Sequence, residues 1–120
     1  MRYRYILSLG ANLGRRKFNC MAAIVILGEF SKIIQKSSFI ETLPLDCKKY
    51  SNKGHSSYIN LVLEILTDLS ALDLYKKIIK IEDSMGHNRE RKWLPRYIDI
   101  DILLWVLNTA DSFSCCPAIA

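Results

Sequence analysis

The order of its predicted elements assigns this sequence to the α+β class, with the pattern β-α-β-β-α-β. Four apolar stretches are typical of strands, and two stretches with helical spacing lie between them. The second and third strands follow each other without an intervening helix, and no internal repeat is present. This order predicts a single antiparallel sheet with both helices on one face.

The first half of the chain contains the first strand, the first helix and the second strand. Residues 3–9 (YRYILSL) predict a strand that ends at Gly10, and residues 32–41 (KIIQKSSFIE) predict another. Between them, a helix is expected from about residue 15 to residue 29. Its spacing puts four apolar residues on one side, namely Phe18, Met21, Ala22 and Val25.

A polar loop over residues 42–57 separates the second strand from the third, and Pro44 and Gly54 interrupt it. Residues 58–66 (YINLVLEIL) alternate between two faces. The expected core face consists of Ile59, Leu61, Leu63 and Ile65. The opposite face then presents Tyr58, Asn60, Val62 and Glu64.

The second helix has recognisable start and stop signals. Ser70 is the expected N-cap, with Asp73 three residues later, and Gly86 suits the position after the last helical residue. Helical spacing runs through Ala71, Leu74, Tyr75, Ile78, Glu82 and Met85. This spacing predicts that Glu82 lies near the buried edge of the helix.

A charged loop, residues 87–97, leads into the fourth strand at 98–107. Every second residue of that strand is apolar: Ile98, Ile100, Ile102, Leu104 and Val106. If this series faces the helices, Asp99 and Asp101 lie together on the open face of the sheet. The whole pattern predicts a ferredoxin-like domain over residues 1–107, followed by an irregular tail over 108–120.

Composition restricts the class of protein and its partners. The 17 Lys and Arg residues outnumber the 12 Asp and Glu residues, for a formal charge of +5, which suits an anionic partner. No apolar run has the length of a membrane span, and the N-terminus does not resemble a secretory signal, so we expect a cytoplasmic protein. The four cysteines show no Cys-x-x-Cys pair, which argues against a zinc site or a disulfide framework.

The two aspartates on the open face are an unusual feature of so apolar a strand. A carboxylate pair is a hard oxygen site that suits Mg²⁺, and Mg²⁺ bound there can hold a polyphosphate. The preceding loop supplies the cations that such a ligand needs, with Arg89, Arg91, Lys92 and Arg96. The alternative is that the aspartates and this loop are simply solvated, with Arg96 paired to a carboxylate. A third class, a small RNA-binding or interaction domain, is disfavoured because acidic residues occupy the open face.

Several ordered motifs resemble one family of enzymes. They are LSLGANLG near the start, SSFIETLPL, SYINLVLEI, IEDSMG and RKWLPRYIDIDILL. Together they resemble 6-hydroxymethyl-7,8-dihydropterin pyrophosphokinase, from about Tyr5 to Trp105. The resemblance implies transfer of pyrophosphate from ATP to the pterin alcohol, release of AMP, and a role in folate biosynthesis. It also implies two Mg²⁺ ions, ATP as co-substrate, a monomer, and no nucleic acid or membrane partner.

The resemblance also implies roles for individual residues. Asp99 and Asp101 match the pair that holds Mg²⁺. The residues matching the pterin site are Thr42, Leu43, Leu45, Tyr58, Asn60 and Trp93. The residues matching the nucleotide site are Glu82, Arg89, Lys92, Arg96 and Ile102, among which Arg89, Lys92 and Arg96 match catalytic cations. Family members usually continue for several tens of residues beyond the fourth strand. The alternative expectation is therefore a pterin- or nucleotide-binding homologue with impaired catalysis.

Overall fold

The helices and strands follow the predicted order, with two additional strand segments, β3 (Ile40–Thr42) and β6 (Cys115–Cys116). The computed structural model describes residues 1–43, 57–86, 97–108 and 115–116. Within these residues the elements are, in chain order, β1 (Tyr3–Ala11), α1 (Arg16–Leu27), β2 (Lys32–Lys36), β3 (Ile40–Thr42), β4 (Tyr58–Thr67), α2 (Ala71–Ser84), β5 (Asp99–Leu107) and β6 (Cys115–Cys116). No helix among them is long and apolar enough to cross a membrane.

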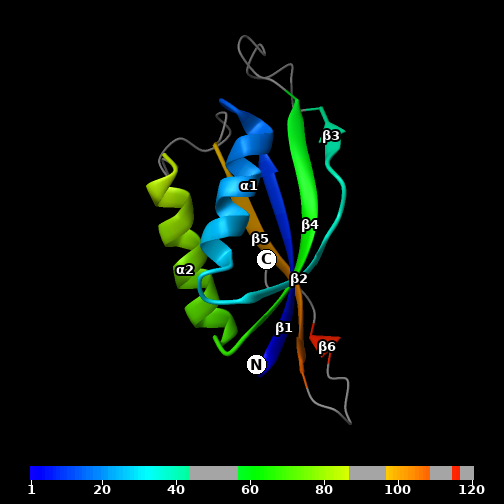
Figure 1. Ribbon diagram of the computed structural model, residues 1–120, viewed down its shortest axis with the longest axis vertical. Coiled ribbons are helices and arrows are strands. Elements are labelled where there is room, and N and C mark those ends of the chain that lie inside the picture. Colours follow the sequence, from blue (N-terminus) through cyan, green and yellow to red (C-terminus); the bar gives the residue numbers. More distant parts are fainter. Residues whose placement is uncertain (44–56, 87–96, 109–114, 117–120) are drawn as a thin grey trace.

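The strands form one antiparallel sheet with β1 at its centre. The order is β2-β4-β1-β5-β6, and β3 pairs with β4 beyond the end of β2. Both helices lie on the same face of this sheet, α1 against β1 and β4 and α2 against β5 (Figure 1). The ferredoxin-like α+β prediction is confirmed, with β2 and β3 together taking the place of one predicted strand. In the segment expected to be irregular, β6 pairs with Trp105 and Val106.

The core lies between the sheet and the two helices. The predicted core face of β4 is confirmed, since Ile59, Leu61, Leu63 and Ile65 are all buried. Next to them, β1 buries Tyr5, Leu7, Leu9 and Ala11. Ile98, Ile100 and Ile102 complete this apolar layer beside α2, as predicted. Within the described part of the chain, no helix covers the opposite face of these strands, and alternation directs the remaining side chains to it.

The buried side of α1 differs from the prediction. Phe18 and Val25 are 61% and 68% exposed, and Met21 is also exposed. The helix instead buries Cys20, Ala23, Ile24 and Leu27. Because α1 carries apolar residues nearly all round, spacing alone does not select the face that meets the sheet. Small residues do so here, since Cys20 and Ala23 let the helix lie close to β1 and β4.

The predicted second strand is divided into β2 and β3. At the division, the backbone N–H of Ser37 donates to the carbonyl of Val62 (2.9 Å), while the Ser37 hydroxyl accepts from the N–H of Val62 (2.8 Å). A side chain thus replaces one backbone acceptor of the ladder. The interruption lets β3 pair with β4 separately, from Ile40 to Thr42.

A bulge in β5 changes which residues face the helices. Ile6 of β1 pairs with Leu104, whereas the next residue, Leu7, pairs with Ile102, so Leu103 is the extra residue. Beyond it, Trp105 pairs with the buried Tyr5 and packs against the core, with its ring edge-on to Tyr3 at 5.8 Å. The prediction that Leu104 and Val106 continue the core face is therefore wrong, because simple alternation does not reveal a bulge.

The helix α2 begins and ends as predicted. The Ser70 hydroxyl accepts from the N–H of Asp73 at 3.3 Å, and Gly86 has a φ of +97°, which favours glycine. Glu82 is buried, as its spacing predicts. Tyr75, expected on the buried side, is exposed instead, because Leu74, Ile78 and Ile81 occupy the contact with the sheet.

Candidate active site on the open sheet face

The open face of the sheet brings together the polar residues that the sequence singles out. Gly10 of β1 pairs with Asp99 on one side and with Asn60 on the other. In the next row of that face, Ser8 pairs with Asp101 and with Val62. Directly paired residues of antiparallel strands point to the same face. Asp99, Asp101 and Asn60 thus share one surface, within three strands.

Gly10 allows the side chain of Asn60 to cross the middle of this surface. A Cβ atom at Gly10 would come within 2.7 Å of the Asn60 Oδ1 and within 3.7 Å of the Tyr58 ring. The Asn60 Nδ2 donates to the Thr42 hydroxyl (2.8 Å) and to the carbonyl of Ile40 (3.4 Å). With its N–H groups directed to β3, the amide of Asn60 has a fixed orientation.

The buried carboxylate of Glu82 connects α2 to the strand that carries the aspartates. Its Oε2 accepts a hydrogen bond of 3.0 Å from the backbone N–H of Ile100, the residue between Asp99 and Asp101. Only 7% of Glu82 is exposed. This contact holds the position of β5 at the carboxylate pair, a role that the sequence did not reveal.

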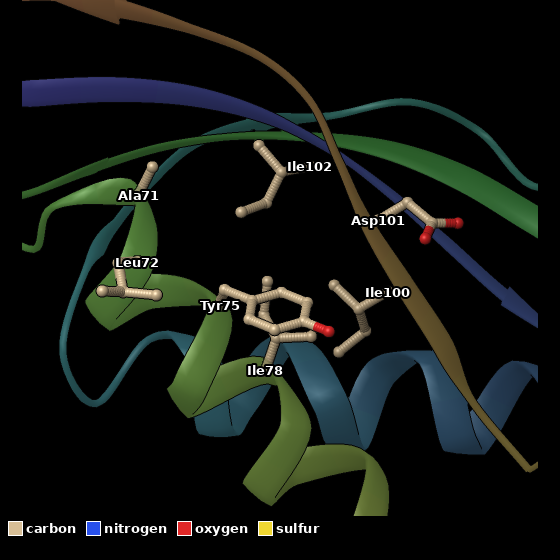
Figure 2. A pocket seen from close by; sticks show the side chains of 7 residues that line it. All are labelled: Ala71, Leu72, Tyr75, Ile78, Ile100, Asp101 and Ile102. Carbon is tan, nitrogen blue, oxygen red and sulfur yellow. The ribbon is translucent and has the colours of Figure 1, made fainter. Parts of the chain in front are cut away.

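A groove of about 400 Å³ lies between α2 and β5, beside the carboxylate pair. Its walls are mainly apolar: Ala71, Leu72, Tyr75, Ile78, Ile100, Asp101 and Ile102. Figure 2 shows the side chains of Ile100 and Ile102 on the groove side of β5, and the carboxylate of Asp101 on the other side of that strand. Ile102, which the family resemblance assigns to the nucleotide site, is one of the residues that line this groove.

Other predicted site residues are only partly covered by the structure. Thr42, the last residue of β3, is exposed and accepts the hydrogen bond from Asn60, and Leu43, which follows it, is 81% exposed. The remaining predicted residues lie outside the described part of the chain: Leu45, Arg89, Lys92, Trp93 and Arg96.

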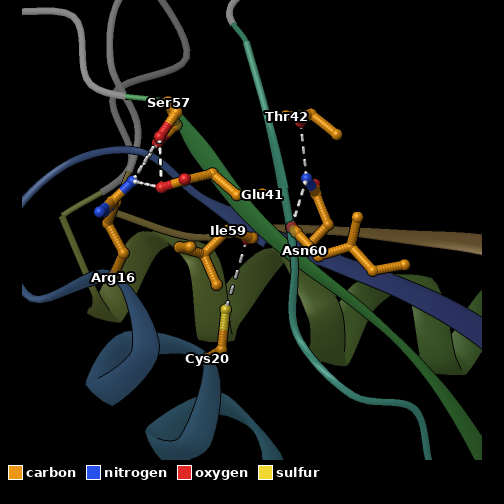
Figure 3. A network of polar contacts seen from close by, with 8 residues as sticks. Arg16, Cys20, Glu41, Thr42, Ser57, Ile59 and Asn60 are labelled. Atoms are coloured by element: carbon orange, nitrogen blue, oxygen red, sulfur yellow. Dashed lines mark hydrogen bonds and ion pairs between the residues drawn. The ribbon is translucent and has the colours of Figure 1, made fainter.

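Three polar residues missed by the sequence interpretation meet beside this surface. Arg16 begins α1, Glu41 lies in β3, and Ser57 immediately precedes β4. Figure 3 shows the guanidinium of Arg16 close to both other residues, and the two hydrogen bonds of Asn60 nearby. The hydrogen bond from Ser57, followed by the contacts with Arg16, lowers the pKa of the Glu41 carboxyl. No local signal pairs these residues, since they are far apart in the chain.

The donor set on the open face fits Mg²⁺. Two carboxylates from one strand face the same way, Asp101 exposed and Asp99 partly buried. In the described residues, no cluster of three or more His, Cys, Asp or Glu side chains would enclose a metal. Mg²⁺ commonly takes one or two protein carboxylates and completes its octahedron with water and substrate phosphates. A site of this kind therefore needs an anionic ligand as well as the protein.

Fold and site together define a small ferredoxin-like domain with a carboxylate pair on β5 and an apolar groove between β5 and α2. A family model for 7,8-dihydro-6-hydroxymethylpterin-pyrophosphokinase (HPPK) matches residues 6–115. The chain belongs to the HPPK family.

Individual relatives agree with this assignment. The chain is 37% identical over 99 residues to a 2-amino-4-hydroxy-6-hydroxymethyldihydropteridine pyrophosphokinase of Aquifex aeolicus, which covers 82% of this chain and 59% of that protein. It is 38% identical over 101 residues to the bifunctional protein FolKE of Lactococcus lactis subsp. lactis, covering 82% of this chain and 28% of that one. The chain thus spans about three fifths, or less, of the length of these relatives.

The fold has a counterpart among solved structures. A crystal structure of Plasmodium falciparum HPPK-DHPS superposes with a TM-score of 0.64 at 19% sequence identity. The match covers 88% of this chain and 30% of that chain. This likeness supports the fold assignment.

Proposed function

We propose that the protein transfers pyrophosphate from ATP to 6-hydroxymethyl-7,8-dihydropterin in folate biosynthesis, in a Mg²⁺-dependent reaction that releases AMP. The main support is the carboxylate pair Asp99 and Asp101, which shares an open sheet face with Tyr58 and Asn60 in a chain of the HPPK family. The proposal includes a cytoplasmic, monomeric enzyme that binds neither nucleic acid nor membranes.

The pterin would lie on the open face over Gly10. Tyr58 offers an aromatic surface for stacking on a flat ring. The N–H groups of Asn60 are donated to β3, so its Oδ1 is available to accept from the N–H edge of a pterin. Thr42, Leu43, Leu45 and Trp93 complete this proposed subsite.

ATP would lie in the groove between α2 and β5. The apolar walls, including Ile100, Ile102 and Tyr75, suit a purine base. The phosphates would then extend towards Asp101, on the other side of the strand. Glu82 supports this part of β5 through Ile100. Arg89, Lys92 and Arg96 are the proposed cations around the phosphates.

The reaction would be a direct displacement. The pterin hydroxymethyl oxygen attacks the β-phosphorus of ATP, and the bond from that phosphorus to the α-phosphate oxygen breaks, so that AMP leaves. The hydroxyl proton passes to solvent, and no covalent protein intermediate forms. Two bound Mg²⁺ ions would supply positive charge that stabilises the negative charge on the phosphate oxygens. Asp99 and Asp101 would hold these ions, and Asn60 and Tyr58 would orient the pterin so that its hydroxyl lies in line with the bond that breaks.

The decisive experiment measures AMP formation from ATP and Mg²⁺, with and without the pterin. Pterin-dependent AMP that is lost in the Asp99→Ala/Asp101→Ala variant supports the proposal. A folded protein that binds pterin and an ATP analogue but releases no AMP would be a binding homologue with impaired catalysis. Absence of both binding and AMP contradicts the whole proposal.

A further inference from the structure

The cluster of Arg16, Glu41 and Ser57 connects three separate parts of the fold. The Nη1 of Arg16 donates to the carbonyl oxygen of Ser57 (2.6 Å) and to its hydroxyl oxygen (2.9 Å), and lies 3.3 Å from the Glu41 Oε2. The Ser57 hydroxyl donates in turn to the Glu41 Oε2 at 2.7 Å. The helix layer is thereby linked to β3 and to the start of β4 (Figure 3).

The position of this cluster relates it to the proposed pterin subsite. Glu41 immediately precedes Thr42, and Ser57 immediately precedes Tyr58, while Thr42 and Tyr58 are directly paired. β3 has three residues, all exposed, and among the described residues it pairs only with β4. So short an edge strand has few ladder bonds to hold it in place. The cluster adds a second attachment of β3 at the end nearest the site.

We propose that Arg16, Glu41 and Ser57 form a clasp that sets the spacing of β3 and β4, and that Arg16 is thereby a positioning residue for pterin binding. This inference rests on the proposed function. The clasp acts through Thr42, whose hydroxyl accepts the 2.8 Å hydrogen bond from Asn60. If β3 shifts away from β4, this bond breaks and the Asn60 amide can rotate.

The exposure of the clasp argues for a positional role and against a role in overall stability. The side chains of Arg16 and Glu41 are 28% and 60% exposed, and ion pairs at such exposure add little to stability. The hydrogen bonds of Arg16 to Ser57 are geometrically more specific, because they fix the backbone just before Tyr58. Loss of Arg16 should therefore change the subsite more than the fold.

The test compares Arg16→Ala with Arg15→Ala in the full chain. Arg15 is a matched control, because it belongs to the same basic run and its guanidinium lies over the Phe18 ring at 5.1 Å, away from the clasp. The measurements are the Kd for 6-hydroxymethyl-7,8-dihydropterin, the Kd for α,β-methylene-ATP with Mg²⁺, and the side-chain amide signals of Asn60 by NMR.

We expect Arg16→Ala to weaken pterin binding by about tenfold, the usual effect of losing a charged hydrogen bond. Binding of the ATP analogue should change by less than about twofold, and the Asn60 amide signals should shift. Glu41→Gln should shift the same signals, and Arg16→Lys should restore part of the pterin affinity. Arg15→Ala should leave all three measurements unchanged.

Two results would overturn the proposed clasp. One is that Arg16→Ala changes neither the pterin affinity nor the Asn60 signals. The other is that it weakens binding of both ligands equally and also lowers the unfolding midpoint. If Arg16→Ala does not fold, Glu41→Gln decides by the same measurements. If the unaltered protein binds no pterin, the proposed function fails separately. The Asn60 signals then decide the clasp, since a shift supports it and its absence overturns it.

Discussion

Gly10 is the residue at which a single methyl group should harm the site most. In Gly10→Ala the new Cβ would lie 2.7 Å from the Asn60 Oδ1, so Asn60 must move, and we expect its hydrogen bond to Thr42 to break. We expect pterin binding to fall at least tenfold, and the free energy of unfolding to fall by about 1–3 kcal/mol, as in other overpacked sites. Calorimetric titration and urea unfolding measure the two effects.

Gly28→Ala is the matched control for this substitution. Gly28 ends α1 with a helical φ of −66°, and a Cβ there would meet carbonyl oxygens at 3.4 and 3.5 Å. Alanine should therefore be tolerated at that position, and pterin affinity should not change. Gly10→Ala with full pterin affinity would show that Asn60 does not orient the ligand.

The contacts of Glu41 should depend on pH. The hydrogen bond from Ser57 and the nearby Arg16 hold the pKa of this carboxyl below its ordinary value of 4.5. Because this pKa is lower in the folded state, the ionised Glu41 carboxylate stabilises the folded clasp. That stabilisation is complete above pH 4.5 and disappears as the pH falls through the lowered pKa. The Asn60 amide signals should thus change below pH 4.5, and Glu41→Gln should remove that change. An identical titration in both proteins would exclude Glu41 as its source.

At the scale of elements, the contact between α2 and β5 should control the carboxylate pair. Glu82→Ala leaves the N–H of Ile100 without this acceptor, and an unsatisfied buried donor costs about 1–3 kcal/mol. We expect the free energy of unfolding, measured in urea, to fall by this amount. Mg²⁺-dependent binding of α,β-methylene-ATP should also become weaker. Glu82→Gln keeps an acceptor oxygen and should retain more of both. Equal effects of the two substitutions would show that the negative charge of Glu82, and not this hydrogen bond, is what matters.

A comparison of the elements with their predictions shows which features of the fold follow from the sequence. Alternation predicted the buried face of β4, and the Ser70 and Gly86 signals bounded α2, because each depends on local geometry. The buried side of α1 and the bulge at Leu103 depend on contacts with distant strands, and local patterns do not contain them. The same applies to the site. The pattern placed Asp99 and Asp101 on one face, whereas the contacts of Arg16 with Glu41 and Ser57 appear only in three dimensions.

The molecule as a whole uses the two faces of one sheet for different tasks. The helices cover one face and supply the core, so the other face is available to hold charged residues that a core would exclude (Figure 1). Ser8, Gly10 and Asn60 of the central strands carry small or polar side chains there, where Asp99 and Asp101 approach from β5. Residues on this face should therefore contribute more to ligand binding than to folding.

The Asp99→Asn/Asp101→Asn variant tests this separation directly. Without ligand, we expect its free energy of unfolding to be unchanged or raised by up to about 1 kcal/mol, because two like charges on one strand face no longer repel. With Mg²⁺ and α,β-methylene-ATP at a hundred times its Kd, the unaltered protein should gain about 2.7 kcal/mol and the variant nothing. Asp68→Asn is the control, since Asp68 follows the far end of β4 and accepts from the N–H of Arg2, a bond that asparagine can keep. Ligand stabilisation of the double variant equal to that of the Asp68→Asn protein would mean that the nucleotide binds independently of the carboxylate pair. A large loss of stability without ligand would instead make the aspartates part of the fold.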